Sequence, residues 1–118
     1  MEIEATARLD VVIIEPKGRL TVETEEQFKT TIQRCLDAGQ TRLLLNLAHV
    51  PYIDSCGLGA IVRAFVSARR RGGDLVLLNV AGRNQHLLTV TKLLTVFKTY
   101  DSDEPGSLRS RFETFASP

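Results

Sequence analysis

Hydrophobic and polar residues follow two different periods along this chain. Residues 10–15 are rich in β-branched side chains and are followed by Pro16-Lys17-Gly18, which predicts a strand that stops at this turn. Residues 43–47 form a continuous apolar run, and residues 74–80 are also largely apolar, which indicates strands buried on both faces of a sheet. Residues 3–8 and 96–100 predict two shorter strands.

Four other segments show helical spacing. The first begins near Thr24, where Thr24 and Gln27 predict a capping box, and it ends at residues 37–39. The second covers residues 56–71, and residues 83–90 and 106–115 predict two more helices. The first helix has one apolar stripe, made of Phe28, Ile32, Cys35 and Leu36. The second has a large apolar stripe (Leu58, Ile61, Val62, Phe65) and a small-residue face (Gly57, Ala60, Ala64, Ala68). The third is predicted to direct Leu87, Leu88 and Thr91 inward.

The order of these elements predicts an α/β fold. Residues 43–80 read as strand, helix and strand, a crossover that makes the two strands parallel and the connection right-handed. A chain of 118 residues can bury about two-thirds of its unfolded surface. We find no internal repeat and no linker, so residues 1–118 are expected to form a single domain.

The junction between the apolar run and the second helix carries the candidate chemistry. Asp54 and Ser55 are both good capping residues, and Gly57 and Gly59 would let other backbone approach the first turn. An anion is favoured there, because the junction lies beyond the carboxyl end of a strand and at the positive end of a helix. The two side chains could do no more than cap the helix. If Asp54 is the N-cap, however, the Ser55 hydroxyl has no capping role and is free to face outward.

Two kinds of enzyme site match this junction poorly. A serine nucleophile elbow needs glycine two residues before the serine, where this chain has Ile53, and the only histidines are His49 and His86. A phosphate-binding loop needs a lysine after its glycines, and a dinucleotide fingerprint needs glycine where Val62 stands. His49 has no ligand-like neighbour in sequence, so no metal site is predicted.

Composition narrows the possible partners and cellular locations of the protein. The net charge of +1 indicates no polyanionic partner, and Arg69-Arg70-Arg71 suits a helix C-terminus better than nucleic-acid binding. Cys35 and Cys56 lack the spacing of a redox motif or a disulfide framework, which fits a reducing compartment. No segment resembles a membrane span or a signal peptide. A cytoplasmic protein that binds neither membrane nor nucleic acid is expected.

The signature Asp54-Ser55-Cys56-Gly57-Leu58-Gly59 resembles that of the anti-sigma factor antagonists, which belong to the STAS domain family. The similarity extends over most of the chain and includes Gly18-Arg19-Leu20, residues 43–47 and residues 70–75. It implies a small mixed sheet of four or five strands, with about four helices packed largely on one side. The chain departs from the family pattern at Cys56, Thr21 and Lys92, where a serine or threonine, an acidic residue and a glycine are common.

The resemblance implies a phosphorylation switch rather than an enzyme. Ser55 would be phosphorylated by a partner anti-sigma factor that is also a serine kinase, and the unphosphorylated form would bind this partner and release the sigma factor. A phosphoserine phosphatase would reverse the modification. The chain would need no cofactor, because the kinase supplies ATP and metal. A monomer or weak dimer is expected.

Candidate partner contacts surround Ser55. They are His49, Tyr52, Ile53, Asp54, Cys56, Gly57, Leu58, Gly59 and Arg63. Arg63 could equally lie on a solvated helix face. Two alternatives remain open: a STAS module that binds a small ligand or another protein without phosphorylation, and an enzyme that uses Ser55.

Overall fold

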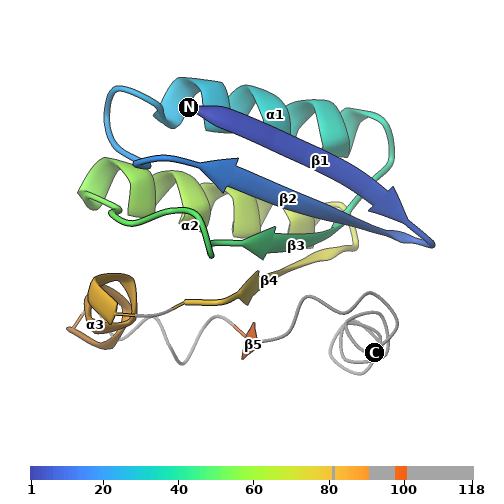
Figure 1. The fold of residues 1–118 in the computed structure, drawn as a ribbon. Helices are drawn as coiled ribbons and strands as arrows, with labels where there is room; N and C mark the ends of the chain where they lie inside the picture. Colours follow the sequence, from blue (N-terminus) through green and yellow to red (C-terminus); the bar gives the residue numbers. More distant parts are fainter. Residues whose placement is uncertain (81, 91–97, 101–118) are drawn as a thin grey trace.

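The computed structural model describes residues 1–80, 82–90 and 98–100 of the chain. These residues form one five-stranded sheet in the order β1-β2-β3-β4-β5, with three helices (Figure 1). The strands are β1 (Glu2–Arg8), β2 (Val11–Lys17), β3 (Arg42–Asn46), β4 (Asp74–Leu78) and β5 (Lys98–Tyr100). The helices are α1 (Glu25–Asp37), α2 (Ser55–Arg70) and α3 (Gly82–Val90).

The sheet is mixed, as predicted. Strand β1 is antiparallel to β2, whereas β2, β3, β4 and β5 are parallel to one another. The predicted parallel pairing of the two buried strands is confirmed, with Leu43 opposite Leu75 and Leu45 opposite Leu77. The carboxyl ends of β2, β3 and β4 therefore meet at one edge of the sheet, where the loop before α2 also lies (Figure 1).

The prediction that Pro16 stops the second strand is wrong. Strand β2 continues through Pro16 to Lys17, and Pro16 lies opposite Ile3 of the outer strand β1. Strand β2 pairs with β3 only from Val12 to Ile14, so the missing N–H of proline lies beyond that parallel ladder.

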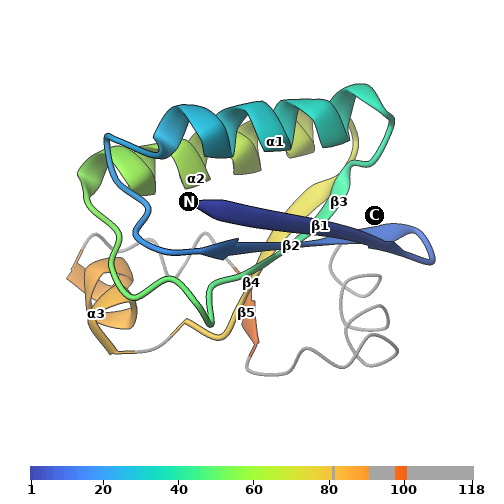
Figure 2. The ribbon, with the colours of Figure 1, turned by 45° about the horizontal axis from the view of Figure 1, so that its top comes forward.

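Helices α1 and α2 lie side by side on one face of the sheet (Figure 2). All four residues of the α1 stripe are buried there, including Cys35, where burial raises the pKa of the thiol. On α2 the small-residue face is the more deeply buried one, with Ala60 and Ala68 almost inaccessible, while Val62 and Phe65 are only partly buried. Small side chains let α2 pack closely, so the larger apolar residues are divided between the core and its margin.

The opposite face of the sheet is also buried. Leu44 points away from Leu43 and Leu45 and joins a second cluster with Val11, Ile13, Val76 and Leu78. The continuous apolar run of β3 therefore reflects burial on both faces, as predicted.

The predicted third helix and last strand are present as α3 and β5, with Leu88 buried and Leu87 half-buried. Thr91, Lys92 and the predicted helix over residues 106–115 lie outside the described residues, so three helices stand against the four expected. None of the helices in the described ranges is long and apolar enough to cross a membrane.

The predicted capping box at the start of α1 is not formed. Thr24 occupies the N-cap position, but its side chain makes no capping bond to the helix. The Thr24 hydroxyl donates instead to the Arg19 carbonyl at 2.8 Å and accepts from the Thr21 N–H at 3.0 Å. Gln27 donates to the Met1 carbonyl. Thr24 therefore stabilises the loop between β2 and α1, which lies next to the candidate site.

Candidate functional site

Asp54 is the N-cap of α2 and joins two loops. Its backbone is extended, with φ −92° and ψ −177°. One carboxylate oxygen accepts from the Gly57 N–H at 2.8 Å, and the other accepts from the Val22 N–H at 3.1 Å. The same side chain thus starts the helix and fixes the β2–α1 loop beside it.

These bonds favour the charged form of the carboxyl group. The Gly57 N–H is the main reason that the pKa of Asp54 lies below its usual value. The N–H groups of Val22 and Cys56 and the positive charge of Arg19 act in the same direction, while partial desolvation opposes them. Asp54 is therefore an anion at neutral pH, and each of its carboxylate oxygens accepts a backbone N–H.

Ser55 is the first residue of α2 and is exposed. Since Asp54 makes the capping bond, the Ser55 hydroxyl has no such role, and no hydrogen bond from it is seen among the described residues. The division of roles expected from the sequence is confirmed: one side chain builds the helix start, and the next is displayed at the surface.

Backbone bonds hold the two loops around Ser55 together. The Leu20 N–H donates to the Tyr52 carbonyl at 3.0 Å, and the Asp54 N–H donates to the Leu20 carbonyl at 3.2 Å, so that Leu20 and Ile53 form a short parallel bridge. The Gly18 N–H donates to the His49 carbonyl at 3.0 Å. The loops after β2 and β3 thus continue the sheet pairing for a few residues, and these bonds hold the backbone next to Ser55 in place.

The two glycines of the signature have different surroundings. A Cβ at Gly57 would collide with the Leu20 carbonyl, so glycine is required for the close approach of the two loops. A Cβ at Gly59 would meet only the Arg63 Nη1 atom, at 3.3 Å. The expectation of a close backbone neighbour is therefore confirmed for Gly57 and wrong for Gly59, which faces a flexible side chain.

Two arginines lie against the ring of Tyr52. The guanidinium carbon of Arg19 is 4.7 Å from the ring centroid, and that of Arg83 is 4.4 Å from it. Next to Arg83, the buried Asn84 donates from Nδ2 to the Val50 carbonyl at 2.7 Å. Helix α3 is therefore attached to the loop that precedes Ser55.

The predicted contact residues fall into three groups. Ile53, Gly57 and Leu58 are buried, so their side chains shape the site from within. Tyr52, Asp54, Cys56 and Gly59 are half-buried around Ser55, and His49 is exposed in the preceding loop.

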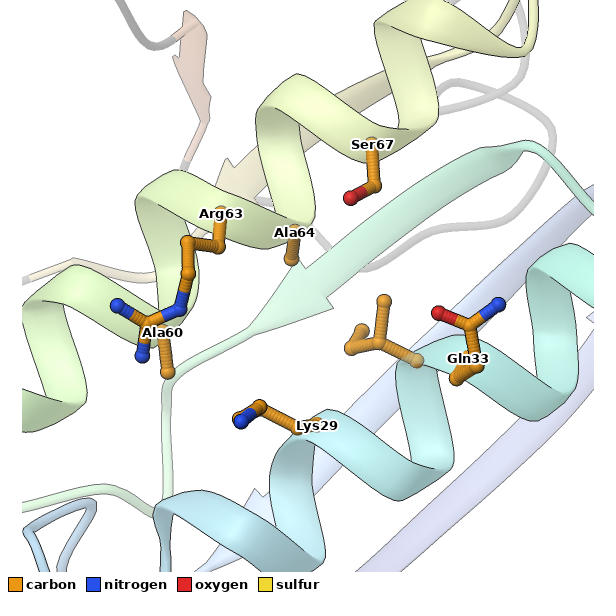
Figure 3. Close-up of a pocket in the computed structure, with 7 residues that line it drawn as sticks. Lys29, Gln33, Ala60, Arg63, Ala64 and Ser67 are labelled. Carbon is orange, nitrogen blue, oxygen red and sulfur yellow. The ribbon is translucent and has the colours of Figure 1, made fainter.

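Arg63 belongs to a different surface. It donates to Glu25 of α1 at 3.2 Å and lines a cleft of about 150 Å³ between α1 and α2 (Figure 3). Lys29 and Gln33 of α1 and Ser67 of α2 rim this cleft, and its floor is apolar. The cleft lies along the helices, whereas Ser55 is at the end of one.

Sequence reasoning missed three residues that the fold brings to the site: Arg19, Val22 and Arg83. Val22 is 59% exposed and its N–H binds Asp54. One signal could have found the first two. If β2 had been predicted to be parallel to β3, the loops after both strands would have been expected at the same edge. Arg83 gave no comparable signal, because its position depends on how α3 packs.

In the part of the chain that the structure describes, no group of three His, Cys, Asp or Glu side chains could hold a metal ion. His86 lies beside Ile53 and Arg83 in a separate hollow, and no described hydrogen bond joins it or His49 to Ser55.

Comparison with known proteins is consistent with this geometry. Residues 2–104 match the STAS domain family. A protein of Thermotoga neapolitana, provisionally named an anti-sigma factor antagonist, is 35% identical over 94 residues, which cover 79% of this chain and 83% of that protein.

Solved structures show the same fold. The crystal structure of a protein from Thermotoga maritima with the same provisional name has a TM-score of 0.86 at 28% identity and covers 94% of both chains. The phosphorylated form of the Bacillus cell fate determinant SpoIIAA has a TM-score of 0.74 at 20% identity, over 93% of this chain and 100% of that one.

Proposed function

The chain belongs to the STAS domain family, and from that premise we propose that it is an anti-sigma factor antagonist controlled by phosphorylation of Ser55. In this proposal the unphosphorylated protein binds an anti-sigma factor that is also a serine kinase, and binding releases the sigma factor. Phosphorylation of Ser55 by that kinase ends the interaction, and a phosphoserine phosphatase restores it. The chain itself catalyses no reaction, and the kinase supplies ATP and metal.

One observation carries the proposal: the Ser55 hydroxyl is exposed at the helix start while Asp54 alone makes the capping bond. A kinase needs a hydroxyl that it can reach, and this one can be modified without removing a contact on which the fold depends. The relatives support the same conclusion, since a protein 35% identical to this chain is named an antagonist and SpoIIAA has been solved in a phosphorylated form.

The energetics favour a local switch over a change of fold. A phosphate on Ser55 would carry a charge of about −1.5 to −2 near neutral pH. The helix dipole favours it by about 0.3–1 kcal/mol, and the charged Asp54 next to it partly offsets that gain. Moving binding from nearly complete to nearly absent takes roughly 5.5 kcal/mol. Like charges across an interface cost several kcal/mol, so we expect the phosphate to block docking directly and to leave the fold unchanged.

The test is phosphorylation in vitro. The purified protein is incubated with its cognate kinase and ATP, and the modified residue is identified by mass spectrometry. We expect one phosphate, on Ser55. Ser67→Ala, a change at another serine of α2, is the matched control and should be phosphorylated like the wild type. Phosphate on another residue, with Ser55 unmodified, would contradict the proposed site.

Binding is measured separately from phosphorylation. Ser55→Ala should bind the kinase with an affinity close to that of the wild type, because the hydroxyl makes no contact that the fold needs. Ser55→Asp should bind more weakly, although one carboxylate copies only part of the charge of a phosphate. Equal affinity of the phosphorylated and unphosphorylated proteins would overturn the switch.

A second function is favoured by one observation. The cleft between α1 and α2 is lined by apolar Ile32, Ala60 and Ala64 and has a polar rim, as small-ligand sites do (Figure 3). Its volume of about 150 Å³ is below the roughly 300–1,000 Å³ of most such sites, so the ligand would be a very small molecule. A STAS module that binds a ligand there would carry a small molecule through purification. Native mass spectrometry would detect it, and Ala64→Phe, which fills the cleft, should remove it.

A further inference from the structure

Arg19, Tyr52 and Arg83 form what we call the arginine–tyrosine cluster. The three residues come from the β2–α1 loop, the β3–α2 loop and the first turn of α3. Both guanidinium groups lie within 5 Å of the Tyr52 ring centroid, at 4.7 Å and 4.4 Å. Tyr52 is only three residues before Ser55, so the cluster lies beside the proposed phosphorylation site.

The two arginines of the cluster are not neutralised by described residues. Over residues 1–80, 82–90 and 98–100, no carboxylate lies within ion-pair distance of Arg19 or Arg83. Asp54 is the acidic group whose charge Arg19 affects, but both of its oxygens accept backbone N–H groups. Within the described ranges, two exposed cations thus share one aromatic ring, and neither forms a direct ion pair.

Four other arginines of the described ranges are ion-paired. Arg42 pairs with Asp10 at 2.7 Å, and Arg69 pairs with Asp74 at 3.2 Å. Arg63 and Arg71 pair with Glu25 and Asp37, each at 3.2 Å. Arg8, Arg34 and Arg70 also have no ion pair among the described residues, so what sets Arg19 and Arg83 apart is that both lie against one aromatic ring three residues before Ser55.

The geometry of the cluster suits the binding of carboxylates. Stacking on a ring holds a guanidinium plane in place and leaves its N–H edge free, and that edge matches the two oxygens of a carboxylate. Arginine and tyrosine are also the residues that most often dominate the binding energy of protein interfaces. Here the bond from the Leu20 N–H to the Tyr52 carbonyl fixes the main chain of Tyr52, which reduces the order that has to be gained on binding.

We propose that the arginine–tyrosine cluster is the contact through which the partner kinase docks, by means of an acidic segment of the kinase that reaches Arg19 and Arg83. This inference rests on the proposed function and specifies the chemistry of the partner surface. Exposed Val22 offers an adjacent apolar contact for the same segment. It lies at a hollow of about 490 Å³ whose lining is mainly polar and holds Glu23 and Asp54 as well as Arg19, so the acidic segment has to reach the arginines without entering this hollow.

The proposal also explains how the negative charge of a phosphate on Ser55 would weaken binding of the kinase. A partner surface that is acidic opposite the cluster would be repelled by a phosphate on Ser55, and the phosphate would compete with it for the same guanidinium groups. A single modification would thus remove the attraction and add a repulsion.

The test compares the binding of the purified kinase to wild-type protein, Arg19→Gln, Arg83→Gln and the double variant. Each single change should weaken binding about tenfold or more. The affinity of the wild type should fall steeply as salt is raised from about 50 mM to about 500 mM, and the double variant should lose most of that salt dependence. Arg70→Gln is the matched control: it removes the same charge from an exposed arginine at the other end of α2, roughly 20 Å from Ser55. It should stay within about twofold of the wild type.

A second measurement separates docking from a structural role, since Arg83 could simply hold α3. Arg19→Lys and Arg83→Lys keep the charge but lose the planar fork, so they should recover only part of the affinity. Their thermal midpoints should match those of the glutamine variants. If affinity instead follows the thermal midpoint across all variants, the cluster is structural and the inference is overturned.

The remaining outcomes are also decisive. If the kinase binds and phosphorylates the wild type but the glutamine variants bind equally well, the inference is wrong and the proposed function stands. If the wild type binds no kinase, both fail. If ATP or inorganic phosphate alone shifts the NMR signals of the Arg19 and Arg83 side chains as strongly as the kinase does, the cluster is a small-anion site and the docking proposal is wrong.

Discussion

The two ends of helix α2 are packed against the domain in the same way but differ in their polar groups. At each end a glycine lies against the backbone of a neighbouring loop: a Cβ at Gly57 would collide with the Leu20 carbonyl, and a Cβ at Gly73 would collide with the Thr41 carbonyl. Both contacts bring α2 close to the rest of the domain. They belong to the architecture, whatever the protein does.

The difference lies in the polar groups. At the C-terminal end, Arg69 pairs with Asp74, which is 3% exposed, and Arg71 pairs with Asp37. At the N-terminal end, Ser55 is exposed and the guanidinium groups of Arg19 and Arg83 have no ion-pair partner in the described ranges. The close glycine contacts therefore do not distinguish the two ends, whereas the exposed Ser55 and the two arginines against Tyr52 belong to the N-terminal end alone.

The largest effect is expected from alanine at the two packed glycines. Gly57→Ala and Gly73→Ala should each lower the free energy of unfolding by about 3 kcal/mol, because a backbone carbonyl cannot move aside as a side chain can. Gly59→Ala is the matched control within the same helix. It should be neutral or stabilise by up to about 1 kcal/mol, since it displaces only Arg63 and removes a flexible residue from a helix. Urea unfolding measures all three. Equal losses at Gly57 and Gly59 would contradict the contrast.

Asp74→Ala should have the next largest effect, at the other end of α2. Its carboxylate accepts from the Leu75 N–H at 2.8 Å and from Arg69 at 3.2 Å. Removing it leaves a buried N–H without a partner, which costs about 1–3 kcal/mol. Urea unfolding should show this loss, while kinase binding should stay unchanged because the site lies at the opposite end. Weaker kinase binding would show that the two ends are coupled.

A smaller effect, with a characteristic pH dependence, is expected from Asp54→Asn. The pKa of Asp54 is lowered in the folded protein, chiefly by the Gly57 N–H, so the charged carboxylate adds stability above the usual aspartate pKa of about 4. That contribution is lost as the pH falls through the lower folded pKa. The wild type should therefore be the more stable protein at neutral pH, and the difference should shrink below about pH 4. Thermal midpoints measured across this range test it. A difference that grows on acidification would contradict the assignment.

The smallest effect on stability is expected from Ser55→Ala. The hydroxyl has no capping bond to lose, so the free energy of unfolding should change by about 1 kcal/mol or less. The same substitution should abolish phosphorylation completely. Calorimetry together with the kinase assay tests both statements. A large loss of stability would show that Ser55 has a structural role that its exposure does not suggest.

The order of strands and helices could be predicted from the sequence because hydrophobic period is a local signal. The same holds for Asp54 and Ser55, whose roles follow from their positions at a helix start. Gly57 and Gly59 look alike in the sequence, and only the packing of Leu20 separates them. Thr24 also has the sequence of a cap, but its hydroxyl oxygen accepts from the Thr21 N–H instead of from a helix N–H. The contact of Arg83 with Tyr52 depends on how α3 packs, which no local pattern records.

The pairing of Leu20 with Tyr52 and Asp54 uses main-chain atoms alone, and this has a consequence for how such proteins diversify. The exposed side chains that follow, Val22 and Glu23, can be exchanged by mutation without changing how the serine is presented. Gene copies that share one scaffold can then acquire distinct binding preferences within a few substitutions, and crosstalk between parallel signalling circuits can be reduced without rebuilding the fold.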